Sequence, residues 1–130
     1  MKLAIETHGA GQPLVLIHGM GSAATAWQPI IPTLAKQFSV VTIDLPGHGR
    51  TPYSPIQKMD PTSLAQLVVK NLKNIGIESF HLVGNSLGGW VSFEIAAFNP
   101  TAVKSITALA PAGLWLWTIA PKCCGLPGQK

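Results

Sequence analysis

The sequence predicts an α/β fold built on a mostly parallel sheet. Short apolar runs rich in β-branched residues alternate with longer segments whose apolar residues recur at helical spacing, and turns rich in glycine and proline separate them. The chain has 130 residues, 47% of them hydrophobic and 11% charged, which suits one domain and excludes a charged disordered chain. Since no internal repeat is present, this alternation predicts βαβ units with right-handed crossovers.

The first part of the chain predicts two buried strands with a short helix between them. Residues 14–17 (Leu-Val-Leu-Ile) and 38–43 (Phe-Ser-Val-Val-Thr-Ile) are apolar and β-branched, as in strands of a covered parallel sheet. Between them the apolar residues follow helical spacing, but Pro29 and Pro32 confine the regular helix to its later turns. A glycine-rich loop follows each of the two strands.

The second part of the chain predicts two helices and two further strands. Asp60 resembles an N-cap, because Pro61 follows it and an apolar stripe then continues until Gly76. The other predicted elements are a strand over residues 79–83, a helix from the serine motif described below to residues 99–100, and a strand over residues 103–109.

Charge and composition argue against several classes of function. The net charge of +4 comes from nine Lys and Arg residues that occur singly, so no nucleic-acid binding is expected. The longest apolar segment, residues 106–120, is shorter than the roughly 20 residues of a spanning helix, so no membrane partner is expected. The adjacent Cys123 and Cys124 form neither a disulfide nor a zinc site, and no metal or other cofactor is expected. Because Glu6 interrupts the N-terminal apolar residues, no signal peptide is expected, and we predict a cytoplasmic protein.

Residues 84–88 (Gly-Asn-Ser-Leu-Gly) have the pattern of a nucleophile elbow. A serine hydroxyl is a poor nucleophile, so the chain must present it to a base and an oxyanion site together, which a sharp strand-to-helix turn does. Gly84 and Gly88 lie where a side chain would crowd this turn around Ser86. The backbone N–H of Leu87 begins the next helix and is a candidate oxyanion donor. The pattern alone is weak, but the strand before it and the helix after it are the context it requires.

Two further motifs precede this serine. Residues 18–21 (His-Gly-Met-Gly) follow the first strand, where a second oxyanion donor is expected, and the backbone N–H of Met20 is the candidate. Residues 44–51 (Asp-Leu-Pro-Gly-His-Gly-Arg-Thr) follow the second strand. Together with residues 84–89, these motifs resemble the α/β-hydrolase superfamily in order and approximate spacing, from about Leu3 to about Leu114.

This resemblance implies a sheet of the α/β-hydrolase type that is incomplete at its C-terminal side. Residues 1–114 would form the N-terminal part of the hydrolase core, and residues 115–130 a divergent or disordered tail. For that tail a natural terminus, a truncation and a frameshift all remain open. The strand over residues 103–109 is then expected to have an unpaired edge, through which the protein would self-associate.

The resemblance also implies hydrolysis of a small carboxylic ester, or of a related acyl or C–C substrate, through an acyl-enzyme on Ser86. Subfamilies with an aspartate nucleophile are disfavoured because residue 86 is serine. In this family the catalytic acid and histidine follow the nucleophile, but no Asp or His follows Ser86, and Glu94 is the only later acidic residue. The isolated chain is therefore expected to be nearly inactive. A non-catalytic binding or assembly protein, or an inert fragment with the same fold, remains the alternative.

Several other residues have a structural interpretation beside a functional one. His18 is either a substitute base or, as we prefer, a residue that orients the loop carrying Met20. His48 and Asp44 are interpreted as residues that hydrogen-bond within their own turn. Trp27, like Trp90, follows the helical apolar spacing and is predicted to lie in the core.

Overall fold

The computed structural model describes residues 1–113 and shows a five-stranded sheet with the strand order β1-β3-β2-β4-β5. The elements in chain order are β1 (Ala4–His8), β2 (Gln12–Ile17), the 3-10 helix η1 (Ala24–Trp27), α1 (Ile31–Leu34), β3 (Phe38–Asp44), α2 (Pro61–Asn74), β4 (Phe80–Asn85), α3 (Leu87–Phe98) and β5 (Val103–Leu109). Strands β3, β2, β4 and β5 are parallel neighbours, and β1 pairs antiparallel with β3. The predicted fold class, an α/β fold with a mostly parallel sheet, is therefore confirmed.

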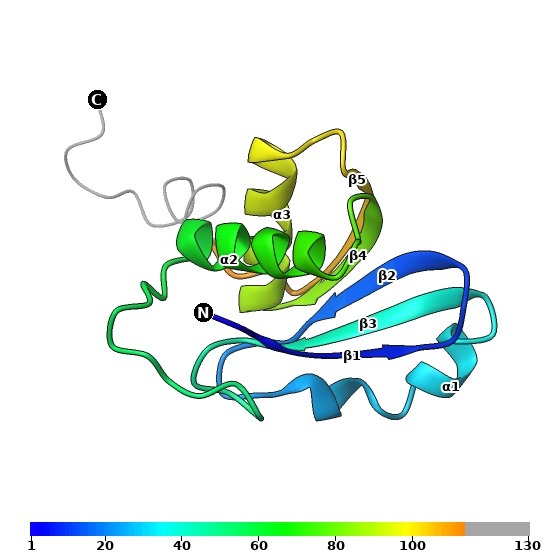
Figure 1. Cartoon of the computed structure of the whole chain (residues 1–130), viewed down its shortest axis with the longest axis horizontal. Coiled ribbons are helices and arrows are strands. Elements are labelled where there is room, and N and C mark those ends of the chain that lie inside the picture. Colours follow the sequence, from blue (N-terminus) through cyan, green and yellow to red (C-terminus); the bar gives the residue numbers. More distant parts are fainter. Residues whose placement is uncertain (114–130) are drawn as a thin grey trace, which may run out of the picture.

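Helices cover both faces of the sheet (Figure 1). Helices α2 and α3 lie on one face, while η1 and α1 lie on the other. Strand β2 contributes to both cores, because Val15 and Ile17 pack toward α2 and α3 whereas Leu14 and Leu16 pack toward Trp27. Alternate residues of a strand point to opposite faces, so a strand covered on both faces has to be apolar throughout.

Helix α2 begins and ends where the sequence predicts. The carboxylate of Asp60 accepts the backbone N–H of Ser63 at 2.9 Å, which satisfies one of the free donors of the first turn. Pro61 is the first helical residue, and Gly76 has a φ of +82° just beyond the last turn. None of the helices among residues 1–113 is long and apolar enough to cross a membrane.

The structure differs from the sequence-based expectation at two places. Strand β1 is not predicted by the sequence, because all five of its residues are exposed or half-buried and its pairing with β3 is long-range. The helix expected before β3 is reduced to η1 and α1, with four residues each. Pro29 and Pro32 explain this, since proline has no backbone N–H to continue a helix.

Strand β5 forms one edge of the sheet, as expected. Within residues 1–113 it pairs with β4 alone, so its outer row of backbone groups is open. Its residues are half-buried or exposed, and Leu109 is 46% exposed. The tail predicted over residues 115–130 lies outside the described residues.

Candidate active site

Ser86 lies at a sharp turn from strand to helix. Strand β4 ends at Asn85 and α3 begins at Leu87, and Ser86 between them has φ 51° and ψ −111°. Residues other than glycine rarely adopt such a positive φ, and a strained backbone persists only where the surrounding structure holds it. Here the Ser86 N–H donates to the Leu109 carbonyl at 2.9 Å, and the Ser86 carbonyl accepts the Ala112 N–H at 2.9 Å. The end of β5 therefore helps to hold the serine in its strained conformation.

Glycines around Ser86 allow three backbone segments to approach closely. A Cβ atom at Gly84 would collide with the carbonyl of Gly88, and a Cβ at Gly88 would collide with the carbonyl oxygen of Ile17. The start of α3 thus packs directly on the carboxyl ends of β4 and β2. The expectation that side chains at these two positions would crowd the turn is confirmed.

The loop after β2 lies beside the serine, because β2 and β4 are adjacent and Ile17 pairs with Gly84. A Cβ atom built on Gly19 would stand 3.4 Å from the Cβ of Ser86. Among residues 1–113, neither the Met20 N–H nor the Leu87 N–H has a backbone acceptor. The structure therefore places the loop that carries Met20 beside the turn that carries Ser86 and Leu87.

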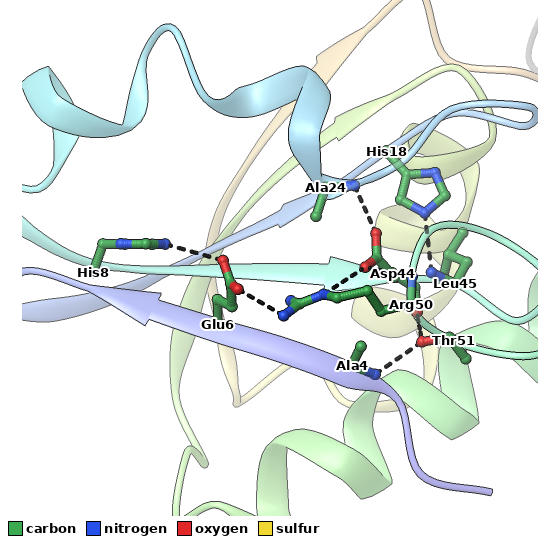
Figure 2. A network of polar contacts seen from close by, with 9 residues as sticks. All are labelled: Ala4, Glu6, His8, His18, Ala24, Asp44, Leu45, Arg50 and Thr51. Atoms are coloured by element: carbon green, nitrogen blue, oxygen red, sulfur yellow. Dashed lines mark hydrogen bonds and ion pairs between the residues drawn. The ribbon is translucent and has the colours of Figure 1, made fainter.

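His18 is engaged through both ring nitrogens. Its Nε2 accepts the Leu45 N–H at 3.0 Å (Figure 2), and its Nδ1 lies 2.7 Å from the carbonyl oxygen of Gly19. Since Nε2 is an acceptor, the proton of the neutral ring is on Nδ1 and is donated to Gly19. Burial of the ring, which is 1% exposed, lowers the pKa of His18, and the nearby His48 lowers it further. Both nitrogens bond away from Ser86, which supports the structural interpretation of His18 over the substitute base.

The lowered pKa of His18 predicts a pH-dependent stability. The folded state binds the His18 proton less readily than the unfolded chain, whose histidine pKa is near 6.5. The neutral His18 ring therefore contributes fully to the stability of the fold above pH 6.5, and this contribution is lost as the pH falls below that value. Urea unfolding from about pH 8 to about pH 5 should show a steeper acid loss in the wild type than in His18→Gln. His81→Gln, at a half-buried site on β4, serves as the control, and equal slopes for wild type and His18→Gln would contradict the prediction.

Asp44 connects three segments through its buried carboxylate (Figure 2). It accepts the Ala24 N–H at 2.8 Å and the Arg50 N–H at 3.1 Å, and it lies 3.7 Å from the Arg50 guanidinium. Arg50 in turn pairs with Glu6 of β1 at 2.7 Å, and Thr51 donates to the Asp44 backbone carbonyl at 2.7 Å. Asp44 therefore stabilises the loop after β3, as predicted, and also the start of η1, which the sequence did not predict.

His48 bonds locally but also reaches the loop after β2. Its Nδ1 lies 2.9 Å from the Pro46 carbonyl oxygen, within its own turn as predicted. Its Nε2 accepts the backbone N–H of Gly21 at 2.9 Å, a contact across 27 residues of sequence. Nothing in the local pattern of either loop signals this second contact.

The other two histidines and Glu94 also have partners away from Ser86. His81 bonds Ser105 and Gln12, and His8 lies 3.5 Å from Glu6. Glu94 accepts the Thr62 hydroxyl at 3.0 Å and the Trp90 indole N–H at 3.2 Å, at the contact of α2 and α3. All four histidines of the chain are thus accounted for, and none of these contacts supplies a base to the serine.

A pocket of about 260 Å³ opens beside the serine turn. It is lined by His18, Gly19, Ser22, Ala26, Trp27, Asn85 and Leu109. Larger hollows, such as one of about 780 Å³ between the N-terminus and α2, do not include Ser86 or its neighbours among their lining residues. Trp27 is buried as predicted, whereas Trp90 is only half-buried. That Trp27 and Ala26 line this pocket could not be inferred from the sequence, because η1 approaches β4 only through the fold.

The family to which this chain belongs follows from its match to a sequence model of known proteins. The sequence model of the alpha/beta hydrolase fold family matches residues 12–122 of this chain. The chain belongs to this family. The sequence-based resemblance to the α/β-hydrolase superfamily is thereby confirmed.

Relatives of this α/β hydrolase include enzymes of two named activities. It is 35% identical over 127 residues to a pimeloyl-[acyl-carrier protein] methyl ester esterase from Aeromonas hydrophila subsp. hydrophila, covering 94% of this chain and 48% of the relative. It is 39% identical over 104 residues to a dihydrolipoyllysine-residue acetyltransferase component of an acetoin cleaving system from Pseudomonas putida, covering 80% and 28%. Among solved structures, an esterase from a marine microorganism matches with a TM-score of 0.78 and 30% identity, covering 82% of this chain and 41% of that one. The α/β hydrolase described here thus spans less than half the length of each of these relatives.

Proposed function

We propose that this protein carries the nucleophile and oxyanion site of a serine hydrolase that cleaves a small carboxylic ester, or a related acyl or C–C substrate. The observation that carries the proposal is the strained Ser86, which lies beside the loop of Met20 and directly before Leu87 at the start of α3. The N–H groups of Met20 and Leu87 have no backbone acceptor among residues 1–113. Membership of the family and the named ester hydrolase among the relatives support it.

In the proposed reaction the Ser86 hydroxyl oxygen attacks the carbonyl carbon of the substrate. The electron pair of the carbonyl moves onto its oxygen, where the Met20 and Leu87 N–H groups stabilise the negative charge. Each such donor typically contributes about 10² to 10³ in turnover, because it is oriented before the charge develops. Collapse of the intermediate expels the alcohol and leaves an acyl group on Ser86, which water then removes.

The reaction also needs a base to take the proton of Ser86, and the chain offers none. Residues 87–130 contain no Asp or His, and the four histidines before them have the partners described above. We therefore propose that the chain is nearly inactive alone. A non-catalytic binding or assembly role, or an inert fragment, is the alternative that this missing base favours. A cytoplasmic location and the absence of nucleic-acid binding stay predictions of the sequence.

A fluorophosphonate probe tests the nucleophile. In excess and over a long incubation it should modify Ser86 slowly, because the oxyanion donors also favour attack on phosphorus. Mass spectrometry of tryptic peptides should locate the adduct on the peptide of Ser86 and show its loss in Ser86→Ala. Ser105→Ala, at an exposed serine of β5, should label like the wild type. A folded protein without any adduct on Ser86 would favour the non-catalytic alternative.

We further propose that the open edge of β5 makes the chain self-associate. Unpaired backbone groups of an edge strand bond readily to another strand, and a lysine on such an edge discourages this. Gel filtration should show species larger than a monomer, and Thr107→Lys, at an exposed position of β5, should shift the protein toward the monomer. Thr101→Lys, just before the strand, is the matched control. A wild-type chain that elutes as a clean monomer would refute the proposal.

A further inference from the structure

The loop that carries Met20 is a single turn held from two sides. The Ser22 N–H donates to the Gly19 carbonyl at 3.2 Å, so residues 19–22 form a β-turn. Gly21 occupies its third position with a φ of +74°, which is typical of a type II turn. In such a turn the peptide between Met20 and Gly21 is the part free to reorient, since types I and II differ mainly by its rotation.

The first two peptides of this turn are each bonded by a different histidine. His18 donates its Nδ1 proton to the Gly19 carbonyl, and the trans peptide then directs the Met20 N–H to the opposite side. His48 accepts the Gly21 N–H at 2.9 Å and thereby sets the orientation of the next peptide. The rings of His18 and His48 lie with their centroids 5.0 Å apart, so they form one cluster around the turn.

We propose that His48 is a positioning residue for the oxyanion turn, and that protonation of His48 releases the turn. This inference rests on the proposed role of Met20 as an oxyanion donor. Nε2 of His48 can accept the Gly21 N–H only while that nitrogen is unprotonated, because the imidazolium ring carries a proton on both nitrogens. After protonation two N–H groups would point at one another, and the peptide between Met20 and Gly21 would lose the bond that orients it.

The charged and titratable groups around His48 influence the binding of a proton to its ring. The ionisable groups around it are His18 just before the turn, Asp44 and Arg50 on the loop of His48 itself, and Tyr53, whose side chain lies near Gly47. A charge on His48 opposes a charge on His18, and the pKa of His18 is already lowered by burial and by His48. Burial thus disfavours the charged form of His18, and a proton on His48 would break the bond on the Gly21 side of the turn.

Nuclear magnetic resonance of the full 130-residue chain tests the inference without requiring catalysis. In ¹⁵N-labelled protein titrated from about pH 8 to about pH 5, the Gly21 amide shift should follow the same midpoint as the His48 imidazole. In His48→Gln, whose amide oxygen accepts a hydrogen bond but does not titrate, this pH-dependent shift should be lost. His81→Gln is the matched control, because His81 also bonds through both nitrogens but has other partners, and it should leave the Gly21 titration unchanged.

The outcomes separate this inference from the proposed function. A Gly21 amide that does not move while His48 titrates, or that keeps its titration in His48→Gln, would overturn the inference. The wild-type titration alone decides the matter if His48→Gln does not fold. Failure of Ser86 to react with the fluorophosphonate, with the Gly21 titration present, would instead refute the catalytic role and leave the histidine-bound turn intact.

Discussion

The isolated chain is expected to hydrolyse nitrophenyl acetate no faster than its Ser86→Ala variant. Where serine and histidine act as a unit, loss of the base costs on the order of 10⁶ in turnover, and only oxyanion stabilisation and binding remain. Neither the residues after Ser86 nor the four histidines before it supply that base. Steady-state release of nitrophenol by purified wild type and Ser86→Ala measures the difference. Turnover at the level of a serine esterase that disappears in Ser86→Ala would contradict this expectation.

A chimera tests the same expectation by supplying the part of the hydrolase that follows residue 113. It continues residue 113 of this chain with the remaining part of the Aeromonas hydrophila methyl ester esterase, of which this chain covers 48%. If the turn at Ser86 and the loop of Met20 are competent and only the base is missing, the chimera should show turnover that depends on Ser86. Ser105→Ala in the chimera serves as the matched control and should keep the activity. A folded chimera without Ser86-dependent turnover would show that the fault lies in the site itself.

Gly88→Ala is expected to lower the free energy of unfolding by about 3 kcal/mol, the upper range for overpacking a core. Helix propensity alone predicts the opposite sign, since alanine stabilises a helix interior by about 1 kcal/mol relative to glycine. The steric effect should dominate because the added Cβ meets the carbonyl oxygen of Ile17, a backbone group inside the sheet that cannot move aside. The same collision would displace the start of α3 and with it the Leu87 N–H.

Gly76→Ala is the matched control for this substitution. Gly76 also lies at a helix, after α2, but a Cβ there has no atom within 4 Å, and only its φ of +82° is unfavourable. Its expected cost is therefore about 1 kcal/mol, the price of a left-handed residue with a side chain. Urea unfolding followed by circular dichroism measures both variants. A Gly88→Ala protein as stable as the wild type would show that α3 can shift without loss.

Features that depend on neighbouring residues along the chain could be predicted from the sequence. Helix α2 could be predicted because Asp60, Pro61 and Gly76 act within one turn of its ends. Strands β2 and β3 could be predicted from their continuous apolar residues, and the turn at Ser86 from Gly84 and Gly88 at a spacing of two residues. In each case the physical cause, a cap, a period or a tight bend, lies within a few residues of its effect.

Features that depend on contacts between distant segments could not be predicted, because they follow from the way the whole chain packs. Strand β1 forms because its backbone pairs with β3. Its side chains show no regular alternation of buried and exposed residues from which a strand could be predicted. The bond from Gly21 to His48 spans 27 residues, and the approach of Gly88 to Ile17 depends on the pairing of β2 with β4. The sequence located the serine and the two candidate donors, but their mutual placement follows from strand order, which is set by packing summed over the whole sheet.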